Sequence, residues 1–147
     1  MDAPTLPPHL EEIVADFELC EGREKLELLL EFARRLPPLP ERWAAQTREM
    51  ESVPECMTPV SVAAELENGG MRFFFAVPEE SPTVRGFASI LEEGLRGAPP
   101  EQVVALPLDF SRRSGLHEVL TSQRLNGLHA MTAHVRRLAA GLLDPAA

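Results

Sequence analysis

The chain has 147 residues, 44% hydrophobic and 25% charged, a size and composition that suit one globular domain with a hydrophobic core. Its formal net charge of −9 predicts that it does not bind nucleic acid, which needs clustered Lys and Arg side chains. No apolar run approaches the roughly twenty residues of a membrane span, and the N-terminal residues lack the pattern of a secretory signal. We therefore expect a cytoplasmic protein that binds neither nucleic acid nor a membrane.

Two helices are predicted in the N-terminal quarter of the chain. Apolar residues recur at helical spacing over 10–17, and again at Leu26, Leu29, Leu30, Ala33 and Leu36. The proline-rich stretch 37–40 should end the second helix, because proline cannot continue the backbone hydrogen-bond ladder. A linker that contains Trp43 then leads to a cysteine loop.

A β-hairpin is predicted next. Apolar and polar residues alternate over 60–67, which is typical of a half-buried strand, and the apolar alternation resumes over 71–77. The intervening Asn68, Gly69 and Gly70 suit a tight turn, because they tolerate positive φ angles. Two strands alone would be marginally stable, so helices should cover the apolar face.

Helices fill the rest of the chain. Ser81 and Pro82 are favourable residues for a helix start, and Gly97 should end that helix. A short helix is expected over 101–105 and a long one over 121–142. The order of elements predicts a single α+β domain over residues 1–147, in which a small antiparallel sheet, the hairpin plus a possible third strand, is flanked by helices.

The two cysteines, Cys20 and Cys56, are too few for a disulfide framework, and neither has a partner at metal-ligand spacing. Cys20 at the end of the first helix is expected to be a small buried apolar residue. Cys56 lies in a loop between two prolines, where reactive groups are often presented. Local sequence leaves two interpretations open for Cys56: a reactive thiol, or a structural one folded under its hairpin.

Four segments, "LPPLP", "VPECMTPV", "SPTVRGFASIL" and "LTSQRLNGLHAM", together resemble the SufE family of sulfur-acceptor proteins, in the family's order. The resemblance implies a small antiparallel sheet flanked by helices, similar to the IscU-type iron–sulfur scaffold proteins. Those scaffolds carry three cysteines. Only Cys56 lies in the matching region, so the resemblance implies no bound cluster, metal or other cofactor.

The resemblance also implies a function. A SufE-like protein takes persulfide sulfur from a cysteine desulfurase of the SufS type, stimulates that enzyme, and passes the sulfur to the SufBCD scaffold complex for iron–sulfur cluster assembly. The desulfurase uses pyridoxal phosphate. The sulfur carrier would be Cys56, and Cys20 should lie out of its reach, because a nearby thiol would resolve the persulfide into a disulfide.

Three further positions are expected to support Cys56. Arg124 matches a family arginine near the cysteine loop, and Glu80 matches an acidic position beside it. Glu55 stands where the family commonly has glycine, which reaches φ angles that a glutamate reaches only with strain. We therefore expect the cysteine loop to rest in a different geometry and Glu55 to raise the thiol pKa of Cys56 when no partner is bound.

Two alternatives stay open at this point. One is a paralogue of the CsdE kind that serves another desulfurase and other acceptors. The other is a non-catalytic interaction module in which Cys56 is structural.

Overall fold

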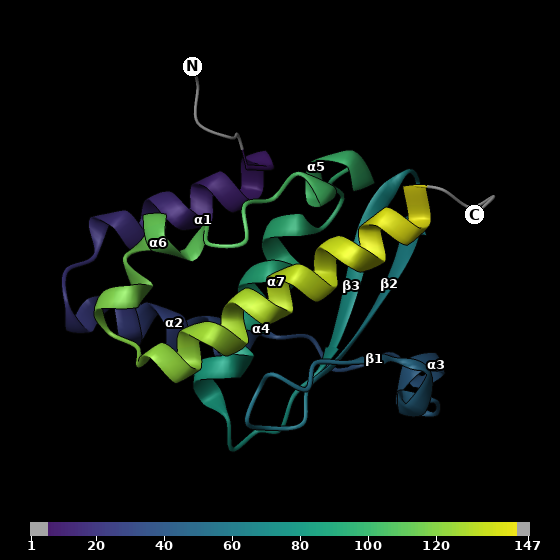
Figure 1. Cartoon of the computed structure of the whole chain (residues 1–147), viewed down its shortest axis with the longest axis horizontal. Helices are drawn as coiled ribbons and strands as arrows, with labels where there is room; N and C mark the ends of the chain where they lie inside the picture. Colours follow the sequence, from purple (N-terminus) through teal and green to yellow (C-terminus); the bar gives the residue numbers. More distant parts are fainter. Residues whose placement is uncertain (1–5, 144–147) are drawn as a thin grey trace.

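The computed structural model describes residues 6–143 of the chain. In chain order its elements are α1 (Pro8–Leu19), α2 (Arg23–Arg35), α3 (Glu41–Ala44), the 3₁₀ turn η1 (Thr47–Glu49), β1 (Glu51–Ser52), β2 (Ser61–Glu67), β3 (Gly70–Ala76), α4 (Pro82–Leu95), α5 (Pro100–Val104), α6 (Ser111–Ser114), the 3₁₀ turn η2 (Leu116–Glu118) and α7 (Ser122–Leu143). The strands form one antiparallel sheet in the order β1-β2-β3, so the predicted α+β class with a third strand is confirmed (Figure 1). No helix within residues 6–143 has both the length and the apolar character needed to cross a bilayer.

The hairpin of β2 and β3 is the centre of the sheet. Asn68 has a φ of 54° and Gly69 a φ of 82°, so both central turn residues are left-handed, as a type I′ turn requires. The register pairs Val62 with Phe75 and Ala64 with Phe73, and these side chains share one face. The predicted turn and the predicted alternation therefore agree with the structure.

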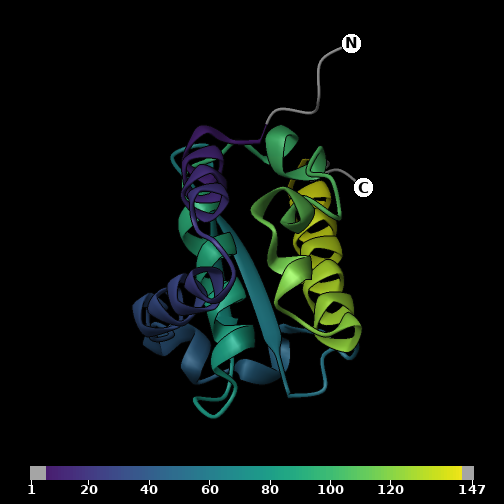
Figure 2. The same ribbon diagram turned by 90° about the vertical axis from the view of Figure 1, so that its left-hand side faces the viewer.

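Helices α4 and α7 contact this face of the sheet, α4 through β3 and α7 through β2. Figure 2 shows α1 and α7 on opposite sides of the molecule, with α4 and the sheet between them. The opposite face of the sheet carries a second, smaller apolar cluster. In that cluster Phe74 packs with Met50, Leu39 and Trp43, and the Trp43 indole N–H donates to Glu65 at 2.8 Å. The linker predicted around Trp43 is thus a structured cover that contains α3 and η1.

Helix α2 buries different residues from the predicted stripe. Leu29 and Ala33 are buried as expected, but Leu26 is only partly buried, and Phe32 and Lys25 are buried in its place. The ammonium group of Lys25 donates to the Phe17 carbonyl oxygen at 3.2 Å and to that of Cys20. The Phe17 carbonyl oxygen also accepts from the Cys20 amide at 3.1 Å. The buried cation thus lies at the C-terminal end of α1, where the helix dipole favours positive charge.

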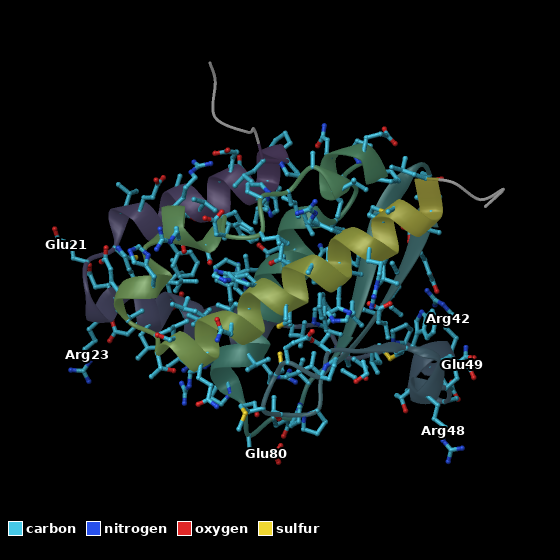
Figure 3. All side chains as sticks on the ribbon, in the orientation of Figure 1. Glu21, Arg23, Arg42, Arg48, Glu49 and Glu80 are labelled. Atoms are coloured by element: carbon cyan, nitrogen blue, oxygen red, sulfur yellow. The ribbon has the colours of Figure 1, made fainter. Side chains whose placement is uncertain are left out.

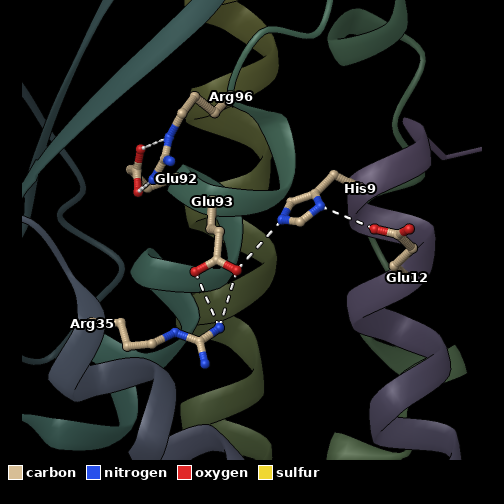
Figure 4. Close-up of polar contacts among 6 residues, drawn as sticks. All are labelled: His9, Glu12, Arg35, Glu92, Glu93 and Arg96. Atoms are coloured by element: carbon tan, nitrogen blue, oxygen red, sulfur yellow. Dashed lines mark hydrogen bonds and ion pairs between the residues drawn. The ribbon is translucent and has the colours of Figure 1, made fainter.

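Helix α4 is buried along most of its length and lies against both α1 and α2. The carboxylate of Glu93 on its exposed edge accepts hydrogen bonds at 3.0 and 3.1 Å from Arg35 of α2. Its other neighbour is the ring of His9 on α1, 3.4 Å away, so one side chain links three helices (Figure 4).

Substitution of Gly86 tests the packing of α4. A Cβ at this position would collide with the backbone carbonyl oxygen of Leu29, which cannot move without shifting α2. We expect Gly86→Ala to lower the free energy of unfolding by about 2 kcal/mol, measured by urea denaturation. Gly141→Ala is the control, because nothing lies within 4 Å of its added Cβ and alanine favours the helix. Equal stability of the two variants would contradict this packing.

Candidate functional site

Cys56 lies in the loop 53–60, which joins β1 to β2 and is called the Cys56 loop below. Its two end residues, Val53 and Val60, are buried, and the Val53 amide donates to the Val60 carbonyl oxygen at 2.9 Å. Within the loop the Cys56 amide donates to the Val53 carbonyl oxygen at 3.2 Å, which closes a turn with Pro54 at its second position. The loop therefore has a fixed base at the edge of the sheet and carries its cysteine on a turn.

Glu55 shows no left-handed backbone conformation. Asn68 is the only non-glycine residue with a positive φ among residues 6–143, so Glu55 occupies an ordinary conformation. This loop makes its turn with Pro54 and needs no left-handed residue beside the cysteine, so a glutamate is accommodated there.

The thiol of Cys56 contacts the first turns of α7. Its Sγ donates to the carbonyl oxygen of Gly127 at 3.6 Å, and the half-buried side chain packs against the main hydrophobic core. A Cβ at Gly127 would lie 3.3 Å from Sγ, tighter than nearly all such contacts. The lack of a side chain at position 127 thus allows the loop to close onto the helix.

This position suppresses ionisation of the thiol. Burial raises the pKa of Cys56 to about 11, and the negative charge of Glu55 adds to the rise. With that pKa only about one thiol in ten thousand is ionised at pH 7. In the closed loop Cys56 is therefore a poor nucleophile.

A pocket of about 550 Å³ opens beside the sulfur. It is lined by the Cys56 loop, the start of α4 and the start of α7 and includes Cys56, Met57, Thr58, Glu80, Ser81, Thr83, Arg124 and Gly127. The hydroxyl of Ser81 donates to that of Thr58 at 3.0 Å, so the loop is also bonded to the residue before α4. This pocket brings two of the expected supporting residues, Glu80 and Arg124, to the same hollow as the cysteine.

Those two side chains do not touch the sulfur directly. The Arg124 guanidinium donates to the Thr83 hydroxyl at 3.0 Å, which joins α7 to α4 at the pocket wall. The side chain of Glu80 is exposed beside the loop and points towards solvent (Figure 3). Both charges therefore lie where a second molecule entering the pocket would meet them.

The third expected residue, Glu55, faces away from the pocket towards α7. Its carboxylate lies 3.2 Å from Nε2 of His134, and Nδ1 of the same ring contacts the carboxylate of Glu51 in β1. His134 was not predicted from the sequence as a neighbour of the Cys56 loop. The sequence did contain a signal for it: His134 follows Gly127 by seven residues, which places both on the same face of the helix.

Cys20 and His129 lie outside the Cys56 pocket. Cys20 is free and partly exposed, not buried as expected, and its Sγ donates to the Asp16 carbonyl oxygen at 3.5 Å. His129 lies 3.5 Å from the Ser111 hydroxyl and does not line the Cys56 pocket. Within residues 6–143, no group of three or more His, Cys, Asp or Glu side chains could hold a metal ion.

Similarity to known proteins agrees with this geometry. The family model named SufE, described as an Fe-S metabolism associated domain, matches residues 11–139. The chain belongs to the SufE family. The matched stretch contains the sheet, the Cys56 loop and the contact with Gly127.

Two named proteins of this family are similar to the chain over most of its length. A SufE-like protein of Mycobacterium tuberculosis is 43% identical over 139 residues, which cover 93% of this chain and 96% of the relative. A protein of Plasmodium vivax named cysteine desulfuration protein SufE is 29% identical over 127 residues, 83% of this chain and 49% of that longer protein.

The fold is shared with a solved structure. The solution structure of a hypothetical protein from Thermus thermophilus superimposes with a TM-score of 0.83 at 38% sequence identity. The match covers 95% of this chain and 98% of the solved one. The helices and sheet described above are therefore those of a known fold.

The pH dependence of alkylation tests whether ionisation of the Cys56 thiol is suppressed. A raised pKa keeps Cys56 protonated until the pH approaches 11, so its rate with iodoacetamide should keep rising without a plateau up to about pH 10. The measurement uses the Cys20→Ser variant, which leaves Cys56 as the one thiol. When the same variant is unfolded in urea, its alkylation rate should level off near pH 9, because 9.0 is the ordinary pKa of a cysteine. An alkylation rate that levels off below pH 9 in the folded protein would contradict the raised pKa of Cys56.

Gly127→Ala tests the contact between the loop and α7. The added methyl group would lie 3.3 Å from Sγ, so the Cys56 side chain or its loop has to shift by a few tenths of an ångström. We expect alkylation of Cys56 at pH 7.5 to become about fivefold faster, equivalent to about 1 kcal/mol of lost contact. Gly141→Ala, on the same helix but with open space around its Cβ, should leave the rate unchanged.

Proposed function

We propose that this chain is a sulfur acceptor, which takes sulfane sulfur from a cysteine desulfurase onto Cys56 and delivers it for iron–sulfur cluster assembly. The observation that carries the proposal is the placement of Cys56. In a SufE-family chain, this half-buried thiol lies on a turn beside a pocket, with the second cysteine outside that pocket.

The chemistry is a displacement at sulfur. The Cys56 thiolate attacks the terminal sulfur of the desulfurase persulfide, a new S–S bond forms on Cys56, and the desulfurase cysteine leaves as a thiolate. One S–S bond replaces another, so no external oxidant or reductant is needed. Delivery repeats the step with an acceptor thiolate as nucleophile.

The closed loop suits storage better than attack. A protonated, half-buried sulfur is slow to react with reductants or oxidants, and the same enclosure would protect a persulfide. The pocket of about 550 Å³ beside Sγ has room for the additional sulfur atom. Attack needs an ionised thiol, so the loop must open when the desulfurase docks.

The pocket rim supplies groups for that docking. Arg124 and Glu80 line the hollow without touching the sulfur, so they are placed to contact a partner that reaches for Cys56. We assign the partner as a desulfurase of the SufS type and the receiving complex as SufBCD, in the cytoplasm. Pyridoxal phosphate belongs to the desulfurase, and this chain needs no cofactor of its own.

Persulfide formation on Cys56 is the decisive measurement. After incubation with a cysteine desulfurase and free cysteine, the intact protein should gain the mass of one sulfur atom, removable by dithiothreitol and located on the Cys56 peptide. Cys56→Ser should gain none and should lose all stimulation of desulfurase turnover. Cys20→Ser is the matched control and should behave as the unsubstituted chain, since Cys20 does not line the pocket.

Two results would overturn this assignment. Absence of added sulfur on Cys56, or stimulation that survives in Cys56→Ser, would make the chain a non-catalytic interaction module. Sulfur loading with a desulfurase of the CsdE-linked type and none with a SufS-type enzyme would keep the chemistry and change the partner.

A further inference from the structure

Met57 is a large apolar side chain that the fold leaves uncovered beside the sulfur. It follows Cys56 directly and is 82% exposed, although the cysteine before it is half-buried. The other large apolar side chains that are exposed within residues 6–143 do not line the Cys56 pocket; they are Leu19, Leu66, Leu108 and Leu143. An exposed methionine thus adjoins the proposed sulfur carrier.

The Cys56 loop presents this side chain from a restrained backbone. The hydroxyl of Thr58, the residue after Met57, accepts a hydrogen bond from Ser81 at 3.0 Å. Pro54 and Pro59 fix their own φ angles on either side of the methionine. A side chain on a restrained loop leaves little backbone freedom to lose when a partner covers it, so more of its burial contributes to affinity.

The position of Met57 in the chain places it at the surface that a partner must approach. Consecutive Cα atoms are about 3.8 Å apart, so a protein whose reactive sulfur reaches Cys56 also comes within reach of the Met57 side chain. The same side chain lines the pocket of about 550 Å³, together with Val84 of α4. The pocket therefore offers a partner apolar groups from two segments, beside the charges of Glu80 and Arg124.

Among these groups, the methionine has the most affinity to contribute. Full burial of an apolar side chain of this size is worth about one to two powers of ten in a binding constant. Exposed ion pairs contribute less, because water and salt screen them. An unbranched thioether side chain also adapts its shape to the cavity that receives it.

We propose that Met57 is a docking anchor, whose side chain enters an apolar recess beside the persulfide-bearing cysteine of the desulfurase and sets the affinity of that complex. The inference rests on the proposed function and adds the residue that recognises the partner. It also describes the partner's surface: an apolar recess next to the reactive sulfur, with charges around it that complement Arg124 and Glu80. A desulfurase with an unpaired polar group in that recess is disfavoured, because Met57 would bury that group without a hydrogen bond.

Direct binding tests the anchor without any sulfur transfer. Every chain carries Cys20→Ser and Cys56→Ser, and calorimetry gives its dissociation constant for a SufS-type desulfurase. Met57→Gln, similar in length but polar, should weaken binding about tenfold, and Met57→Leu should retain most of the affinity.

Leu19→Gln is the matched control for this measurement. Leu19 is 83% exposed, as Met57 nearly is, but it ends α1, which lies on the opposite side of the molecule from α7 (Figure 2). Its substitution should leave the dissociation constant unchanged. Circular dichroism of each variant shows that the compared chains are folded.

Oxidation of Met57 gives a second readout. Met50, Met71 and Met131 are buried, so among the methionines within residues 6–143 excess hydrogen peroxide should convert Met57 to its sulfoxide first. One peroxide oxygen passes to the thioether and water is left. Bound desulfurase should slow this oxidation, followed by mass spectrometry of the Met57 peptide. The oxidised chain should bind about tenfold more weakly, because a sulfoxide is polar.

Equal dissociation constants for Met57→Gln and Leu19→Gln would overturn the anchor, as would a Met57 that oxidises equally fast in the complex. Absence of binding by the parent chain would overturn it as well. The sulfur relay is judged separately, by the added mass on Cys56. A chain that docks through Met57 but gains no sulfur refutes only the relay, and a chain that gains sulfur although Met57→Gln binds normally refutes only the anchor.

Discussion

The close contact between the Cys56 loop and α7 is the interaction on which the site depends. The absence of a side chain at position 127 leaves Sγ room to approach the Gly127 carbonyl oxygen without crowding. The same contact removes much of the thiol from water, which raises its pKa. This one contact thus both shields the sulfur from solvent and keeps it protonated. A sulfur-transfer reaction needs the thiol to be exposed and ionised, so it must reverse both effects.

The rest of the fold holds the two sides of that contact in place. Strand β1 is only two residues long, yet it pairs with β2 and fixes one end of the loop at the sheet edge. Helix α7 lies against β2 and α4, and α4 is in turn packed against α1 and α2. The loop at the edge of this scaffold is held by its buried end residues, Val53 and Val60.

The charges around Cys56 divide into two groups with different surroundings. Arg124 and Glu80 line the open pocket, where they are available to another molecule. Glu55 lies on the other side of the loop and is bonded to His134. The acidic residue that disfavours ionisation of the thiol is therefore also one that bonds the loop to α7.

The sequence by itself determined the local elements, the class of fold and, through four short segments, the family. The hairpin turn at Asn68 and the apolar alternation depend on neighbours within a few residues, so pattern was sufficient. The cover around Trp43, the burial of Lys25 and the bond between Glu55 and His134 were decided only by tertiary structure. The last pair is separated by 79 positions in the chain, and helix or strand periodicity carries no information on which distant side chains meet. Burial, which sets the reactivity of Cys56, is likewise a property of the packed molecule, because it depends on how closely another helix approaches.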